Sequence, residues 1–124
     1  MNKVTDTYHV SARLLKALAH PIRLRLLYAL RDNEECVCHL TALMRQRQAY
    51  VSQQLMFLRR AGLLTDRKEG LRVYYRVRDP RVFDVLDAVN ACTGVKRVPV
   101  EKPRLAVCSC PKCGHKKSLK QEVE

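Results

Sequence analysis

The stretch that decides the fold is QRQAYVSQQLMFLRRAGLL, residues 46–64. Within it, Val51, Leu55 and Leu58 recur at spacings of four and three residues, which predicts a helix with one apolar stripe. Gly62 follows the last periodic residue and suits a left-handed conformation at the end of that helix. An ordinary amphipathic surface helix is the alternative that these residues alone leave open. The opposite face carries side chains that can bond base edges and phosphates, namely Gln48, Ser52, Gln53 and Arg59.

The flanking segments add three helices before this stretch and a hairpin and one more helix after it. We expect residues 1–7 to be loose, and helices over residues 8–19, 21–31 and 38–45. Pro21 ends the first helix and begins the second, because it lacks an N–H and fixes φ. The first helix would bury Val10, Leu14 and Leu18, and the second would bury Ile22, Leu26, Leu27 and Leu30.

Residues 64–77 predict a β-hairpin that turns at Glu69-Gly70. A fifth helix is expected from Asp79, as N-cap, and Pro80 to about residue 92, with Gly94 ending it. This order of elements predicts a mainly α, winged helix-turn-helix fold with five helices and a small β-hairpin as the wing. Residues 46–64 would then hold the recognition helix.

The predicted hairpin alternates apolar and basic residues, so we expect one apolar face and one basic face suited to phosphates. A wing that is merely soluble is the alternative. In the hairpin Val73, Tyr75 and Val77 alternate with Arg72, Tyr74, Arg76 and Arg78. The candidate DNA-binding residues are Gln48, Tyr50, Ser52 and Gln53 on the helix, and Arg67, Lys68 and Arg72 on the wing.

The composition favours an anionic partner. The 124 residues include 24 Lys+Arg against 12 Asp+Glu, a net charge of +12. Double-stranded DNA is the first candidate partner. An acidic membrane surface is weaker, because no basic helix has a bulky aromatic face. With no secretory signal or membrane-spanning run, we expect a cytoplasmic protein whose six cysteines are metal ligands or redox thiols. No nucleophile–base pair or paired-carboxylate motif predicts an enzyme, and nothing predicts an organic cofactor.

With these elements in view, the chain resembles the ArsR/SmtB family of metal-responsive winged-helix repressors. The residues that carry the resemblance are LKALAHPIR (15–23), EECVCHL (34–40), VSQQL (51–55), LRRAGL (58–63), RKEG (67–70) and YY (74–75). The resemblance implies a homodimer built on the first and fifth helices. It also implies DNA binding in the ion-free state and release when a metal or metalloid binds.

This sequence departs from the family pattern at three places. Glu35 and His39 stand where the family's cysteine box has Leu and Asp, and the family's recognition-helix pattern S-Q-P-x-x-S-x-H is replaced, so no operator sequence can be carried over. Relatives that sense zinc or nickel on the fifth helix have Asp and His residues there. Here Arg81 stands at the His-like position, which predicts that this site is absent.

The Cys36-x-Cys38 pair is the first candidate metal site. Two residues apart on a helix, side chains point about 200° from each other. The sulfurs can share an ion only if Cys36 lies in an extended segment that enters the helix, where the helix dipole also favours thiolates. The alternative is two buried cysteines that act as small hydrophobes. Sulfur ligands select soft ions such as Cd(II), Pb(II), As(III) or Zn(II).

Residues 95–124 form a basic tail beyond the predicted domain of residues 1–94, and this tail holds Cys108, Cys110 and Cys113. Two sulfurs are too few for a soft ion. In the cadmium- and lead-sensing relatives the further ligands come from an N-terminal arm, but residues 1–35 contain no cysteine. We therefore predict that the tail thiolates complete the site, from the same or the partner subunit.

Three alternatives stay open for the cysteines. A separate structural zinc in the tail, with His115 as a further ligand, is one. A thiol redox sensor on the same scaffold is the second, and an interaction module that holds zinc but binds no DNA is the third. Cys92 is expected to be packed at the end of the fifth helix.

Overall fold

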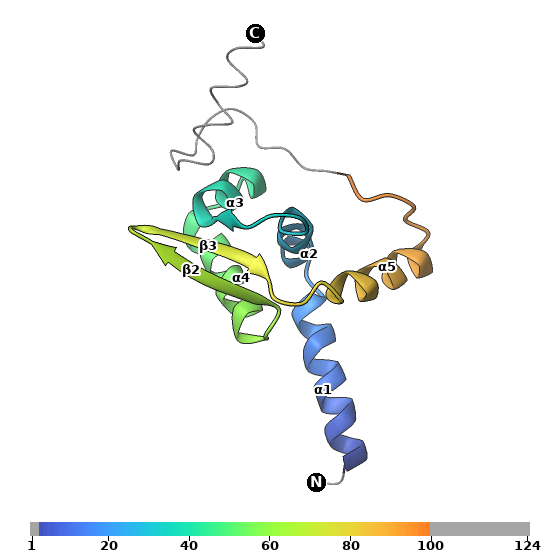
Figure 1. Cartoon of the computed structure of the whole chain (residues 1–124). Coiled ribbons are helices and arrows are strands. Elements are labelled where there is room, and N and C mark those ends of the chain that lie inside the picture. The colour runs from blue at the N-terminus through green and yellow to red at the C-terminus, as the bar shows by residue number, and fades with distance from the viewer. Residues whose placement is uncertain (1–2, 100–124) are drawn as a thin grey trace.

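The computed structural model describes residues 3–99 and has the predicted winged helix-turn-helix architecture (Figure 1). The central helices and the hairpin form the body, while the first helix projects away from it and the last helix lies at its side. The elements are α1 (Lys3–Leu18), α2 (Pro21–Ala29), β1 (Glu35–Cys36), α3 (Val37–Met44), α4 (Gln48–Arg60), β2 (Leu64–Glu69), β3 (Arg72–Val77) and α5 (Val82–Thr93).

The core lies between α2, α3, α4 and the hairpin. The apolar stripe predicted on α4 is confirmed, because Val51, Leu55 and Leu58 are all fully buried. Three residues of α2 that were predicted to face inward, Ile22, Leu26 and Leu27, are buried as well, and so is Leu30 at its C-cap. Gly62 has a φ of 83°, a left-handed conformation in which a residue with a side chain would be strained. This glycine lets the chain turn from the recognition helix directly into β2.

The sheet has a third strand that the sequence did not predict. Its order is β1-β3-β2, and both pairs are antiparallel. In the middle of β3, Tyr74 pairs with Cys36 on one side and with Arg67 on the other. Tyr74 is only 7% exposed because it packs against Cys36. The assignment of Tyr74 to the basic face of the hairpin is therefore wrong.

The outer helices differ from prediction at their ends. α1 begins at Lys3, so the expected loose segment over residues 3–7 is wrong; Asp6 in its first turn suits the positive end of the helix dipole. Val10 and Leu14, predicted to face inward, are exposed. α5 begins at Val82 rather than at Pro80. Asp79 still caps the preceding turn, since its Oδ1 accepts a hydrogen bond from the Arg81 N–H at 2.9 Å.

Gly94 ends α5 as predicted, with a φ of 79°. The predicted boundary between the folded domain and the tail lies directly after this glycine. None of the helices within residues 3–99 is long and apolar enough to cross a membrane. The tail cysteines and His115 lie outside the described residues.

Candidate DNA-binding face and cysteine site

The outer face of α4 presents the polar side chains that the sequence selected. Gln48 and Gln53 are exposed, whereas Ser52 and Tyr50 are half-buried. Tyr50 packs partly against the main core, so its ring helps to hold the start of α4. The amide groups of the two glutamines are free to approach a ligand on this face, where they can donate and accept hydrogen bonds.

Arg23 on α2 fixes the position of α4, a role that sequence analysis missed. Its Nε donates to Gln54 Oε1 at 3.0 Å, and its guanidinium lies 4.0 Å from the centroid of the Phe57 ring. Its Nη1 donates to the backbone oxygens of Lys16 and Ala17, both at 3.1 Å. One side chain thus joins the end of α1, α2 and the recognition helix.

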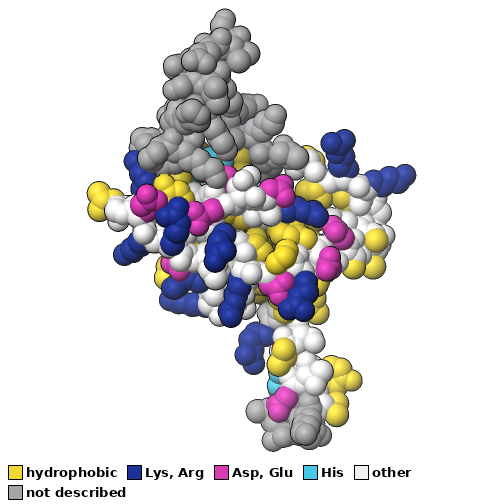
Figure 2. All heavy atoms as spheres, in the orientation of Figure 1, with side chains coloured by type: hydrophobic (Ala, Val, Ile, Leu, Met, Phe, Trp, Pro, Cys, Tyr) yellow, Lys and Arg dark blue, Asp and Glu magenta, His cyan; other side chains and the backbone are white. Residues whose placement is uncertain are grey.

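The three wing residues selected from the sequence differ in their surroundings. Lys68 is exposed and Arg72 is half-buried. Arg67 is held by two carboxylates: its Nη2 lies 2.7 Å from Glu34 Oε1, and its Nη1 lies 2.8 Å from Glu69 Oε2. Hydrogen bonds to Glu34 and then to Glu69 raise the pKa of Arg67, so this side chain stays charged. Figure 2 shows Lys and Arg side chains spread over the visible face, with Asp and Glu between them.

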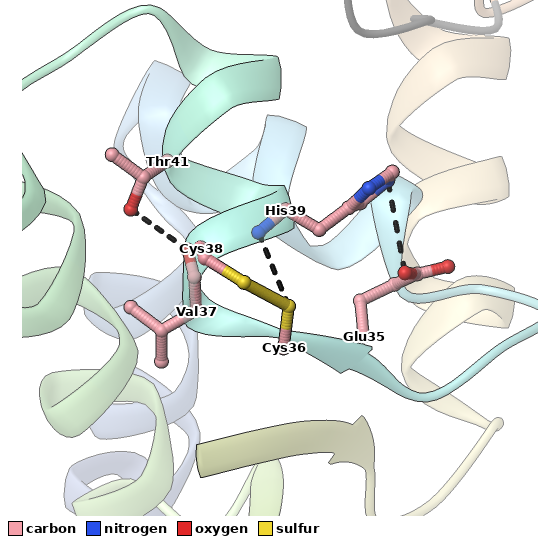
Figure 3. The surroundings of a disulfide bond; sticks show 6 residues. All are labelled: Glu35, Cys36, Val37, Cys38, His39 and Thr41. Atoms are coloured by element: carbon pink, nitrogen blue, oxygen red, sulfur yellow. Dashed lines mark hydrogen bonds and ion pairs between the residues drawn. A yellow bond between two sulfur atoms is a disulfide. The ribbon is translucent and has the colours of Figure 1, made fainter. Parts of the chain in front are cut away.

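The cysteine pair lies where the chain passes from β1 into α3 (Figure 3). Cys36 has extended backbone angles, φ −79° and ψ 156°, as the sharing of one ion by the two sulfurs requires. Its Sγ accepts a hydrogen bond from the His39 N–H at 3.3 Å and so caps the helix. Cys36 and Cys38 are joined by a disulfide, with their Cα atoms 5.4 Å apart. Cys36 is 1% exposed and Cys38 is half-buried.

Glu35 and His39, which depart from the family pattern, form a buried pair beside the cysteines. His39 Nε2 lies 3.7 Å from Glu35 Oε2, and both side chains are more than nine-tenths buried. In Figure 3 the imidazole points away from the two sulfurs. Both residues line a hollow of about 1070 Å³ that is bounded by α2, α5 and residues 95–99. Pro99, the last described residue, also lines it.

The pair supplies two adjacent sulfurs, which suits a soft ion but does not complete its coordination. Within residues 3–99, no group of three or more His, Cys, Asp or Glu side chains is placed to hold a metal. At the start of α5, Arg81 Nη2 lies 2.7 Å from Asp79 Oδ2, and this hydrogen bond lowers the pKa of Asp79. Cys92 is exposed, so the prediction that it is packed is wrong.

The sequence model of the arsR family of bacterial regulatory proteins matches residues 20–66. The biofilm growth-associated repressor of Agrobacterium fabrum is 40% identical over 80 residues, which span 64% of this chain and 68% of that protein. This chain belongs to the ArsR family. A transcriptional repressor SmtB homolog of Synechocystis sp. is 43% identical over 80 residues, 64% of this chain and 61% of that protein.

Solved structures share the fold. Reduced HlyU from Vibrio cholerae superposes with a TM-score of 0.64 at 32% identity, covering 74% of this chain and 97% of that one. The family resemblance seen in the sequence is therefore confirmed, and so is the winged helix-turn-helix fold. The alignment with the first two relatives covers only about two thirds of each of those proteins.

Replacing Arg72 or Gln53 with alanine should distinguish a contact to the DNA backbone from a contact to the bases. We expect Arg72→Ala to weaken binding to all DNA sequences alike and to reduce the salt slope of log K by about one for each phosphate that the arginine no longer neutralises. Gln53→Ala should instead relax sequence preference, with the salt slope kept. Fluorescence anisotropy at several salt concentrations, on selected and on unrelated duplexes, checks both. An unchanged salt slope for Arg72→Ala would show that the wing assignment is wrong.

Proposed function

We propose that this ArsR-family protein is a transcriptional repressor that binds operator DNA as a homodimer and releases it when a thiophilic ion binds its cysteines. The ion would be As(III), Cd(II), Pb(II) or Zn(II). One observation carries the proposal: the sulfurs of Cys36 and Cys38 meet at the start of α3, the helix that precedes α4. An ion held there acts directly on the helix-turn-helix.

The tail thiols would complete the coordination. Cys36 and Cys38 supply two sulfurs, whereas a soft ion takes three or four ligands. The path of the chain supports this source, because Pro99 lines the same hollow as Glu35 and His39, which flank the pair. Residues 100–107 precede Cys108, and a stretch of this length reaches at most about 30 Å when extended. Cys108, Cys110 and Cys113 of the same or the partner subunit are therefore the proposed further ligands.

Binding would release DNA because it ties the tail to the segment before the recognition helix. An ion that binds more tightly to the DNA-free arrangement than to the DNA-bound one must, by linkage, weaken DNA binding by the same factor. We expect a coupling free energy of about 1–3 kcal/mol per site, which is typical of allosteric proteins. A tail that holds its own structural zinc, apart from the Cys36/Cys38 site, is the alternative arrangement. A role at operator DNA is in keeping with the cytoplasmic location expected from the sequence.

The projecting helix α1 supports the homodimer. Apolar side chains on it are exposed, with Tyr8 at 69% and Leu15 at 54%, and Val89 on α5 is 46% exposed. Apolar exposure of this kind favours burial against a second subunit. The family resemblance implies a dimer contact on these same two helices.

The dimer predicts the geometry of the DNA site. The recognition helices would enter successive major grooves, so the half-sites should lie about 34–36 Å apart, or a multiple of that distance. Selection of duplexes from a random pool, followed by footprinting and sedimentation of the complex, measures the spacing and the stoichiometry. A monomer that binds one palindromic site tightly at micromolar concentration would contradict the dimer.

A second candidate function is thiol redox sensing by the same cysteines, favoured by the disulfide between Cys36 and Cys38. The two candidate functions are distinguished by the metal content of the protein and by the agent that causes DNA release. Metal retained by the reduced protein, with DNA release that needs the ion, supports ion sensing. DNA release by an oxidant in the presence of a chelator, reversed by a thiol reductant, supports redox sensing.

A further inference from the structure

A row of three side chains crosses the sheet from the cysteine pair to the wing. Tyr74 is the register partner of Cys36 in β1 and of Arg67 in β2. Residues directly opposite each other in antiparallel strands share one face and pack together. Accordingly, Tyr74 and Cys36 form one buried cluster, against which Cys38 packs. The Arg67 guanidinium lies 4.5 Å from the centroid of the Tyr74 ring.

Arg67, at the far end of this row, also bonds to a residue close to the cysteines. Arg67 Nε donates to Glu34 Oε1 at 2.9 Å, and Nη2 lies 2.7 Å from the same oxygen. Glu34 directly precedes β1 and lies two residues before Cys36. The guanidinium is thus fixed between the Tyr74 ring and a carboxylate, both of which adjoin the cysteine pair. Its second carboxylate, Glu69, belongs to the wing itself.

This arrangement sets up a competition for one cation. An arginine forms short, charge-assisted hydrogen bonds with carboxylates and with phosphates alike. While Arg67 donates through Nε and Nη2 to Glu34, those groups are not available to a DNA phosphate. Because the two partners are similar in chemistry, a change in the position of Glu34 that weakens its hydrogen bonds to Arg67 favours the phosphate.

We propose that Arg67 is a phosphate contact of the wing that the cysteine pair controls through Tyr74 and Glu34. Joining Cys36 to Cys38 fixes the backbone from β1 into α3 and presents Glu34 to Arg67, which withdraws the arginine from DNA. Separate thiols free this junction and release Arg67 to a phosphate. The inference rests on the proposed DNA-binding function, and names the contact through which the cysteine site acts.

The bridge in this structure is a disulfide, and a low-molecular-weight disulfide can form it. Thiol–disulfide exchange then proceeds through a mixed disulfide. Each cysteine loses one proton, the two sulfurs form one bond, and the oxidant is reduced to two thiols. An ion shared between the two sulfurs would fix the same junction without any change of oxidation state.

The test compares the salt dependence of DNA binding in the two states of the full chain. Reduced protein is compared with protein treated with oxidised glutathione, after mass spectrometry of a digest has shown the Cys36–Cys38 bond. The DNA is a duplex selected from a random pool by the reduced chain. Withdrawing one arginine per subunit from a phosphate makes the slope of log K against log salt shallower by about two per dimer. The weakening of DNA binding by oxidation should then be about ten times larger at 50 mM than at 200 mM salt.

Three variants and one matched control test whether the change in slope comes from Arg67, Glu34 and the cysteine pair. Arg67→Gln should have the shallow slope in both states, and Glu34→Gln should keep the steep slope in both. Glu69→Gln is the matched control, because it also removes a carboxylate partner of Arg67 but belongs to the wing, and it should switch like the wild type. Cys38→Ser, which cannot form the bond, should keep the steep slope after treatment and so excludes an effect of the other four cysteines.

The outcomes separate this inference from the proposed function. If oxidation weakens DNA binding but leaves the slope unchanged, or if Arg67→Gln switches like the wild type, the role of Arg67 is refuted while the repressor stands. If the reduced chain selects no duplex, the proposed function fails, and this inference fails with it.

Discussion

Cys36→Ser is expected to abolish the response of DNA binding to Cd(II). A serine oxygen is a harder and weaker donor than a thiolate for a soft ion, so the remaining ligands would hold Cd(II) poorly. With the ion-linked coupling of about 1–3 kcal/mol removed, the roughly 5- to 150-fold weakening of DNA binding by the ion should disappear. Anisotropy of labelled DNA, with and without Cd(II), measures this, and ultraviolet sulfur-to-metal absorption reports the number of thiolates bound.

Cys110→Ser tests whether the tail belongs to the same site. If the site is shared, this variant should lose thiolate absorption and DNA release together, as Cys36→Ser does. Cys92→Ser is the matched control, because Cys92 is exposed on α5 and has no part in the proposed site. The shared site is refuted if each variant loses only its own independent ion and Cys110→Ser still releases DNA when Cd(II) is added.

Leu55→Ala in the recognition helix is expected to cause a large loss of stability. Leu55 is fully buried and packs in the cluster that joins α4 to α2 and α3. Truncating a buried leucine costs about 2–5 kcal/mol, since its apolar packing is removed and a cavity remains. The free energy of unfolding of an ordinary domain is only about 5–15 kcal/mol, so this substitution removes a large share of that stability.

The control for this substitution is its neighbour on the outer face of the same helix. Met56 is 38% exposed, and Met56→Ala should change the free energy of unfolding by about 0.5 kcal/mol or less. Urea unfolding at one fixed protein concentration compares the three proteins, because the stability of a dimer depends on concentration. Equal midpoints for Leu55→Ala and Met56→Ala would contradict the assignment of the buried face.

The parts of the fold that sequence analysis predicted are those encoded by local patterns. The apolar stripe of α4, the break at Pro21, the turn at Gly70 and the end of α5 at Gly94 each depend on a few consecutive residues. The structure confirms all four. Local periodicity was wrong for Val10 and Leu14. It assigned both side chains to the protein core, but they are exposed on α1, which projects from the body.

What sequence analysis missed depends on contacts between distant segments. β1 is only two residues long and exists because it pairs with β3, so no periodicity could reveal it. That pairing also buries Tyr74, which alternation alone assigned to the basic face. No local pattern indicates the role of Arg23, because its partner Gln54 lies 31 residues away. Long-range pairing therefore decides how the cysteine site is joined to the wing.

Titration of Cd(II) into the reduced, DNA-bound wild-type chain tests the central claim most directly. Thiolate absorption and DNA release are followed in the same sample, with chelator added at the end. The proposed function predicts that both signals rise together, saturate at one ion per subunit with three or four sulfurs bound, and reverse with chelator. Stoichiometric binding of Cd(II) to the cysteines while DNA affinity stays unchanged would contradict it.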